Sequence, residues 1–215
     1  MSRPTDQAPP TTLVGWLAQG ALDPPLAALL WQLMEGGLPL TVAGPAGSGR
    51  HALLAALAEL RPAPIARQRS RLPEVVEADS LAALDALLAA APYGAQEDEL
   101  RTLGVVLVLG AQRPDQPGVV VAHYVRPLEL DGHGHVQRRP PAVLASWDPA
   151  AARFDDYAWG ILSELAARVG VEARGFSAER QRRSAYLAGL VAAGDTSPDD
   201  VRRALAGYRV TANRL

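Results

Sequence analysis

The sequence predicts an α/β fold in which a parallel strand core carries an antiparallel hairpin at its edge and a helical segment follows at the C-terminal end. Three observations predict this fold. An apolar run at residues 38–44 ends in glycine and is followed by leucines at helical spacing. The run LGVVLVLG at residues 103–110 has the continuous apolar character of a strand buried on both faces. From residue 155 onward, helical patterns replace extended ones.

The composition fits one main globular domain and excludes several classes of function. The chain has 215 residues, of which 48% are apolar, so it is long enough for one sizeable core. It contains no cysteine, which excludes disulfides, thiolate metal sites and a cysteine nucleophile. A formal net charge of −2 gives no positive field that would attract nucleic acid. The N-terminus lacks the apolar stretch of a signal peptide, and no apolar run is long enough to span a bilayer. We therefore expect a cytoplasmic protein without direct membrane insertion and without a nucleic-acid partner.

The first part of the chain is expected to be a tail followed by two helices. Residues 1–11 contain three prolines and no periodic apolar face, which predicts a disordered tail. Residues 12–22 place apolar side chains on one helical face. In residues 23–37, Asp23 stands where an N-cap is needed, two prolines occupy the first turn and two glycines end the pattern. These signals predict a second helix.

The middle of the chain alternates between irregular and regular patterns. Residues 61–73 are rich in proline and arginine and are expected to form a loop. The short run at residues 74–78 is a candidate strand. Residues 79–92 predict a helix that is capped by Asp79 or Ser80 and broken by a proline.

The second half begins with extended runs and ends with helices. Two extended runs flank Asp131 and Gly132, a dipeptide favoured in hairpin turns. Nearby prolines would remove ladder donors, so the hairpin is expected at a sheet edge. Three helices should follow, the first ending at Gly170, the second at Gly194 and the third beginning at Ser197. The prolines in question are Pro127, Pro140 and Pro141.

The most specific motif is the glycine-rich segment between the first predicted strand and the helix after it. The sequence GPAGSGRH places Gly44, Gly47 and Gly49 where a phosphate-binding loop has its glycines. Such glycines let backbone amides point at phosphate oxygens, and the helix N-terminus adds a favourable dipole. The segment also follows a predicted strand and opens a predicted helix, which is the context that the motif requires. A tight βα turn without a ligand is the alternative.

Two residues depart from the motif. Arg50 stands where a lysine reaches the β- and γ-phosphates, and its planar fork does not substitute directly for a compact ammonium. His51 stands where a hydroxyl would bind Mg²⁺, and an imidazole nitrogen suits that ion poorly. A metal-holding carboxylate is also missing from the end of the apolar strand, where Gly110 stands. Asp115, or Glu77 and Asp79 after the short strand, are weaker alternatives. We therefore predict no catalytic residue and no metal ligand.

Residues 12–60 resemble the ATPase core of the type II/IV secretion and type IV pilus motor family, a family of P-loop NTPases. The resemblance rests on the helix leading into the loop, the loop itself and the leucine-rich helix behind it. The segment ERQRRSAYLAGLVAAGDTSPDDVRRALAGY is similar to the closing helices of archaeal-type members. The family's acidic box, second nucleotide motif and histidine box have no counterpart in residues 61–103. The resemblance implies a P-loop NTPase-like core and places Gly44, Gly47, Ser48 and Gly49 at cradle positions, with Arg50 and His51 as departures.

Two other groups of residues have competing interpretations. His123, His133 and His135 would form a metal site if the hairpin brought them together. Without a carboxylate pattern beside them, we expect two exposed turn histidines and one half-buried strand histidine. Five arginines near the C-terminus would form a basic patch, or a solvated helix face compensated by Glu179, Asp199 and Asp200, and we expect the latter. These arginines are Arg180, Arg182, Arg183, Arg202 and Arg203.

The sequence thus divides into a tail at 1–11, a degenerate P-loop NTPase-like α/β core at 12–148 and a helical C-terminal segment at 149–215. The predicted function is that of a non-hydrolysing protein that binds ATP or ADP weakly or not at all and acts through a protein partner or a second copy of itself. The alternative is an active ATPase of the motor type with an atypical loop, which would also require Mg²⁺. The predicted nucleotide-contacting residues are Gly44, Pro45, Ala46, Gly47, Ser48, Gly49, Arg50 and His51.

Overall fold

A computed structural model describes residues 9–61, 72–114, 116–194 and 197–212 of the chain. Its first half contains α1 (Leu13–Ala18), α2 (Pro24–Glu35), β1 (Leu40–Gly44), α3 (Arg50–Ala58), β2 (Val75–Glu77), α4 (Leu81–Ala89) and α5 (Glu97–Leu100). Its second half contains β3 (Val105–Arg113), β4 (Gln116–Tyr124), β5 (Glu129–Leu130), β6 (Val136–Gln137), β7 (Ala142–Asp148), β8 (Arg153–Asp156), the 3-10 helix η1 (Ala158–Ile161), α6 (Leu162–Arg168), α7 (Ala173–Ala193) and α8 (Pro198–Ala212).

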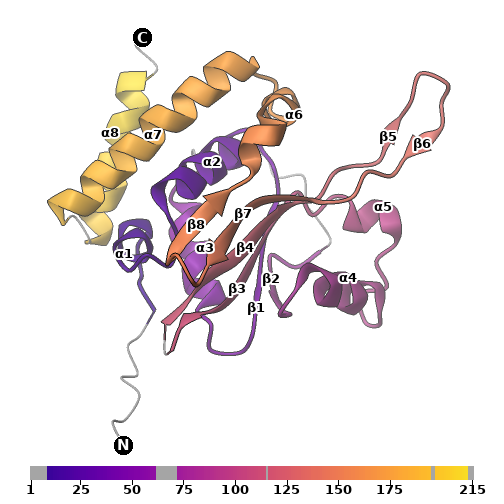
Figure 1. Ribbon diagram of the computed structural model, residues 1–215, viewed down its shortest axis with the longest axis horizontal. Helices are drawn as coiled ribbons and strands as arrows, with labels where there is room; N and C mark the ends of the chain where they lie inside the picture. The colour runs from indigo at the N-terminus through magenta and orange to yellow at the C-terminus, as the bar shows by residue number, and fades with distance from the viewer. Residues whose placement is uncertain (1–8, 62–71, 115, 195–196, 213–215) are drawn as a thin grey trace, which may run out of the picture.

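The fold is a mixed six-stranded sheet with helices on both faces (Figure 1). The strand order is β2-β1-β3-β4-β7-β8. β1 runs parallel to both β2 and β3, while the pairs β3–β4, β4–β7 and β7–β8 are antiparallel. The predicted α/β class with a parallel core is therefore confirmed, and the antiparallel part of the sheet is larger than the sequence predicts.

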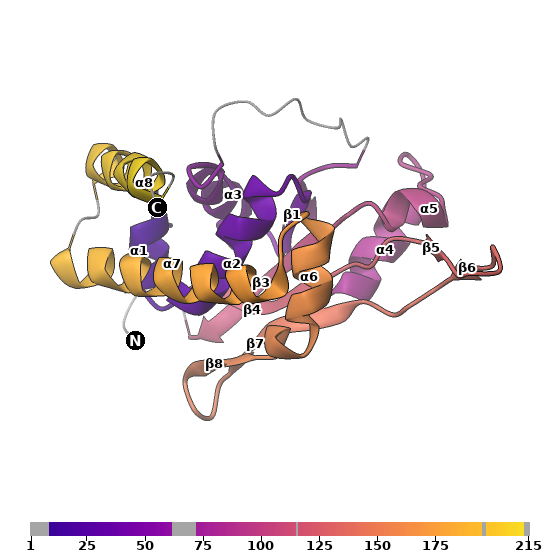
Figure 2. The same cartoon turned by 90° about the horizontal axis from the view of Figure 1, so that it is seen from above.

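The two faces of the sheet build two separate cores because successive side chains along a strand point to opposite faces. On β3, Leu107 and Leu109 belong to the larger core, whereas Val106 and Val108 belong to the smaller one. The larger core lies under α1, α2, α3, α7 and α8, and the smaller core lies under α4, as Figures 1 and 2 show. Five consecutive residues at the start of β3 are buried, which confirms a strand covered on both faces.

Local signals set the helix ends. The Asp23 side chain accepts a hydrogen bond from the Leu26 amide and caps α2, and the helix ends at Gly36, as predicted. Ser80, the second of the two predicted caps, accepts from the Ala83 amide at the start of α4. Gly194 ends α7 with a φ of 75°. The short helix α5 is not predicted by the sequence.

The predicted hairpin forms, but its position differs from the expectation. β5 and β6 form a separate two-stranded sheet, and both figures show this hairpin reaching away from the body of the molecule. β4 and β7 flank this hairpin in the sequence and pair with each other in the interior of the main sheet. The extended runs on either side of Asp131 and Gly132 therefore do not form the edge of that sheet, contrary to the expectation. The three prolines stand between the strands of this region and remove no donor from the ladder. The edge strand on this side is β8, which lies in a segment expected to be helical.

The described residues bear on three further expectations. Of the predicted tail, residues 1–8 lie outside the described part of the chain, and Pro9 and Pro10 belong to no helix or strand. The predicted loop at 61–73 falls largely outside it as well. In the described part of the chain, no helix has the length and apolar character needed to cross a membrane.

Candidate functional site

The glycine-rich turn joins the end of β1 to the start of α3, in the middle of the parallel part of the sheet. The Ser48 amide donates to the Pro45 carbonyl at 3.2 Å and closes the turn. Gly47 and Gly49 have φ angles of 76° and 82°, in the left-handed region that favours glycine. Gly49 is also the N-cap of α3 and has no side chain to satisfy the first amides of that helix. The strand, turn and helix predicted for this segment are therefore present.

The back of the turn is tightly packed against the strands. A Cβ atom on Gly44 would lie 2.8 Å from the Ser48 Oγ and 2.9 Å from the Leu109 Cβ, so only glycine fits there. Ser48 itself is 4% exposed, and its hydroxyl has no hydrogen-bond partner among the described residues. The Ser48 side chain is therefore buried beneath the turn, against β1 and β3.

The α3 end of the turn packs against the N-terminal part of the chain. A Cβ on Gly49 would lie 3.0 Å from the Trp16 Cη2 and 3.1 Å from the Pro9 Cβ. Trp16 is 1% exposed, and its indole nitrogen has no partner among the described residues. The start of α3 thus lies beside α1.

Arg50 is directed to the ends of β1 and β2. Its Nη1 donates to the carbonyl oxygen of Gly44 and, at 3.2 Å, to that of Val76. Its Nη2 lies 3.4 Å from a carboxylate oxygen of Glu77. The Arg50 side chain is 13% exposed, whereas the Glu77 side chain is 66% exposed. The guanidinium therefore joins two adjacent parallel strands through their main chain, and its charge is partly matched by Glu77.

The other residues considered for nucleotide chemistry, where the structure describes them, do not place a carboxylate beside Gly44. Pro45, Ala46 and Gly47 are exposed at the front of the turn, and His51 is exposed on the first turn of α3. β3 reads VVLVLGAQR and contributes no carboxylate beside Gly44. Asp79 is exposed and accepts a hydrogen bond from the Ser80 hydroxyl, while Asp115 lies outside the described residues.

The three histidines are not brought together. His133 and His135 are exposed near the tip of the β5–β6 hairpin, with ring centroids 6.4 Å apart, as expected for turn residues. His123 lies on β4, and partial burial lowers the pKa of its imidazole. Within the described ranges, no three His, Cys, Asp or Glu side chains are placed to hold a metal ion.

The arginines near the C-terminus fall into two groups, and this corrects the expected solvated face. Arg182, Arg202 and Arg203 are exposed and pair with acidic residues of their own helices, as predicted. Arg180 and Arg183 instead point into the protein. Arg180 is 9% exposed, pairs with Asp156 at 2.9 Å and donates to the Pro25 carbonyl. The sequence does indicate that these two arginines are buried, because both share the helical spacing of Phe176 and Leu187 on the apolar face of α7.

Arg183 is the centre of a cluster that joins α2, α7 and α8. Its guanidinium nitrogens lie 2.6 Å from Glu35 and 2.7 Å from Glu179. Its guanidinium carbon lies 4.6 Å from the ring centroid of Trp31. Arg209 and Tyr208 of α8 contact the same two carboxylates, so the cluster connects three helices. We call Trp31, Glu35, Glu179, Arg183, Tyr208 and Arg209 the Arg183 cluster.

Contacts within the cluster shift the pKa values of Glu179 and Tyr208. Burial acts to raise the pKa of the Glu179 carboxyl, but hydrogen bonds from Arg183 and Arg182 outweigh it and hold this pKa below its ordinary value of 4.5. The pKa of the Tyr208 hydroxyl is raised by burial and by its hydrogen bond to Glu179. Glu179 is therefore ionised and Tyr208 neutral at physiological pH.

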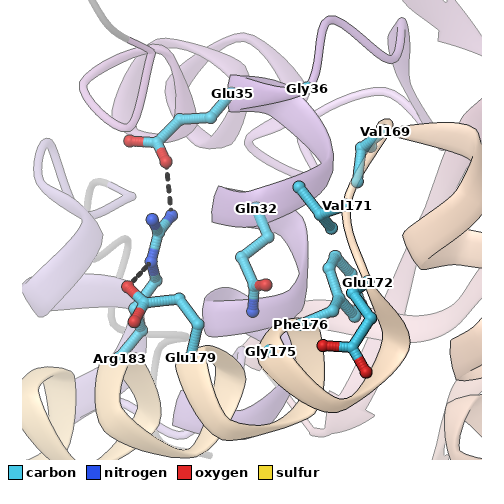
Figure 3. Close-up of a pocket in the computed structure, with 10 residues that line it drawn as sticks. All are labelled: Gln32, Glu35, Gly36, Val169, Val171, Glu172, Gly175, Phe176, Glu179 and Arg183. Carbon is cyan, nitrogen blue, oxygen red and sulfur yellow. Dashed lines mark hydrogen bonds and ion pairs between the residues drawn. The ribbon is translucent and has the colours of Figure 1, made fainter.

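Beside this cluster, a pocket of about 420 Å³ opens between α2 and α7 (Figure 3). Glu35, Glu179 and Arg183 form one side, and Val169, Val171 and Phe176 form the other. None of the lining residues belongs to the glycine-rich turn. The sequence does not predict this pocket, because its walls come from α2 and from residues 169–183, which are far apart in the chain.

Comparisons with known proteins assign no family. No family model matches the sequence, and a search of curated proteins found no match.

Proposed function

We propose that this protein is a degenerate P-loop protein of the secretion-motor type that does not hydrolyse nucleotides. It binds ATP or ADP weakly or not at all, and it acts in the cytoplasm through contacts with a protein partner or a second copy of itself. The observation that carries this proposal is the placement of Arg50, whose guanidinium is bound to the main chain of two strands.

The contacts of Arg50 support the proposal because they compete with phosphate binding. A hydrogen bond from a charged group contributes about 1.5–3 kcal/mol. Turning Arg50 toward a phosphate would break two such bonds, to the Gly44 and Val76 carbonyls, and the ion pair with Glu77. The pair with exposed Glu77 adds only about 0–1 kcal/mol, so the two carbonyl bonds decide the outcome. A phosphate contact by Arg50 would therefore gain little net free energy.

The residues present also fit Mg²⁺ poorly. The position after Arg50 offers the imidazole of His51 where a hard cation prefers a hydroxyl or carboxylate oxygen. The preceding Ser48 hydroxyl is buried beneath the turn, and the adjacent strand β3 contains no acid. An active ATPase would need to supply the missing ligands from elsewhere.

The proposal predicts that nucleotides leave the stability of the wild-type protein unchanged. A ligand at 100 times its Kd stabilises the native state by about 2.7 kcal/mol, which for a chain of this size raises Tm by about 5–10 °C. We expect ATP or ADP with Mg²⁺ at millimolar concentration to raise Tm by less than about 1 °C in a thermal-shift measurement.

Two variants make this measurement informative. Arg50→Lys combined with His51→Thr restores the motif and releases the strand carbonyls, so it should acquire a nucleotide-dependent rise in Tm. Glu77→Gln removes only the ion pair and should not, because both carbonyl bonds of Arg50 remain. A large shift in the wild-type protein, lost in Arg50→Ala, would overturn the proposal in favour of an active nucleotide site.

A further inference from the structure

The pocket between α2 and α7 has one side whose charges are already matched. Arg183 is held between Glu35 and Glu179, and its side chain is 11% exposed. Each of these carboxylates has a second arginine, Arg209 on Glu35 and Arg182 on Glu179. An anionic ligand would therefore compete with two carboxylates for Arg183. This side of the pocket offers no free positive charge.

The opposite side combines apolar surface with one free carboxylate. Val171 is 48% exposed, and Phe176, which also lines the pocket, is 2% exposed. Glu172 lies between them in the sequence and is exposed at the same side of the pocket, away from Glu35 and Arg183 (Figure 3). In the part of the chain that the structure describes, Glu172 has no ion-pair partner, unlike Glu35 and Glu179. The uncompensated charge of the pocket is therefore negative and stands next to its apolar wall.

The pocket has open space beside Gly175, and the polar group of Gln32 at its wall is already hydrogen-bonded within the protein. Gly175 lines the pocket, and a Cβ atom placed on it would meet nothing within 4 Å. Gln32 is 8% exposed, and its amide, oriented to satisfy both of its ends, donates to the Phe176 carbonyl and accepts from the Arg180 amide. The Gln32 amide is thus occupied in joining α2 to α7. The groups left to bind a ligand in this pocket are the Glu172 carboxylate and the apolar wall formed by Val169, Val171 and Phe176.

We propose that this pocket binds an organic cation, an ammonium or guanidinium group carried on an apolar body. The cationic group pairs with Glu172, and the apolar body packs on Val169, Val171 and Phe176. A pocket of about 420 Å³ lies within the range of small-molecule sites. This inference is independent of the proposed function, because the pocket shares no residue with the glycine-rich turn.

The test titrates the full chain with benzylammonium and follows amide shifts by NMR. We expect a Kd on the order of 1 mM, with shifts centred on residues 169–176. Benzoate and benzyl alcohol, which keep the ring and change the charge, should bind at least about fivefold more weakly. Equal binding of all three compounds, or shifts located elsewhere, would overturn the proposal.

Variants on α7 separate the pocket from general effects. Glu172→Gln should weaken benzylammonium binding about fivefold, as expected for a partly exposed ion pair. Gly175→Leu should abolish it by filling the pocket. The matched control is Gly189→Leu, which makes the same change at another open glycine of α7 outside the pocket and should bind as the wild type does. Both leucine variants replace a helical glycine, which favours folding. Unchanged binding in Gly175→Leu would contradict the assignment.

The source of the cation is tested separately. A capped Leu-Arg-Leu peptide carries the same chemistry on a polypeptide. Binding that is at least about tenfold tighter than that of benzylammonium would identify a basic side chain of a protein partner as the natural occupant. Peptide binding no tighter than that of the free amine, lost in Gly175→Leu, would identify a small organic amine. Peptide binding that survives Gly175→Leu would contradict the pocket as the site.

Discussion

Replacing Trp31 with alanine is expected to lower the free energy of unfolding by about 3–5 kcal/mol. Trp31 is completely buried in α2, and its indole nitrogen donates to Glu35 at 2.7 Å. Its ring lies 5.1 Å from the Tyr208 ring and supports the Arg183 guanidinium. Alanine would leave a cavity at the junction of α2, α7 and α8 and remove a donor from Glu35. Chemical denaturation followed by circular dichroism measures the change.

The chain provides a matched control for this substitution. Trp159 lies in η1 and is 74% exposed, so Trp159→Ala should change the free energy of unfolding by less than about 0.5 kcal/mol. A similar loss in both variants would show that the tryptophan at the helix junction contributes no more than an exposed one. That result would contradict the assignment of Trp31 to the core.

Replacing Arg183 with alanine is expected to cost about 3 kcal/mol. Removing one partner of a buried ion pair leaves the other charge without compensation, which costs more than the pair itself contributes. Arg183→Ala would do this to Glu35 and Glu179 together, although Arg209 and Arg182 would still offset part of their charge. It would also remove the cation from the face of Trp31. Chemical denaturation at neutral pH measures the effect.

The adjacent residue is the control for this second prediction. Arg182 contacts the same carboxylate, Glu179, at 2.7 Å, but its side chain is 66% exposed. Exposed ion pairs contribute about 0–1 kcal/mol, so Arg182→Ala should be nearly neutral. Equal destabilisation by the two substitutions would mean that burial of the pair is not what makes Arg183 important.

The local part of the fold could be predicted from the sequence because its signals are local. Asp23 and Gly36 mark the ends of α2, and Ser80 caps α4. The uninterrupted apolar run of β3 predicts a strand that is buried on both faces. The strand, turn and helix around Gly47 were predicted for the same reason, because left-handed glycines and a following leucine pattern lie within a few residues of one another.

The parts of the structure that the sequence does not predict depend on contacts between residues that are distant in the chain. β8 has a short polar sequence, and it is a strand because β7 pairs with it at the sheet edge. Arg183 was expected in solvent because arginine usually lies there. Its helical spacing from Phe176 and Leu187 marks the buried face of α7, but the Glu35 carboxylate that pairs with it is far away in the sequence. The direction of the Arg50 side chain also depends on a distant element, since β2 supplies the Val76 carbonyl and the Glu77 carboxylate. No pattern around residue 50 contains that information.

Steady-state ATP hydrolysis by the purified wild-type chain with Mg²⁺ tests whether the glycine-rich turn supports nucleotide hydrolysis. Because the guanidinium of Arg50 is bound to the ends of β1 and β2, we predict no turnover above the uncatalysed background. Arg50→Ala serves as the control for contaminating activity. Turnover at about 1 s⁻¹ or faster, lost in Arg50→Ala, would contradict a non-hydrolysing role and identify this protein as an active ATPase.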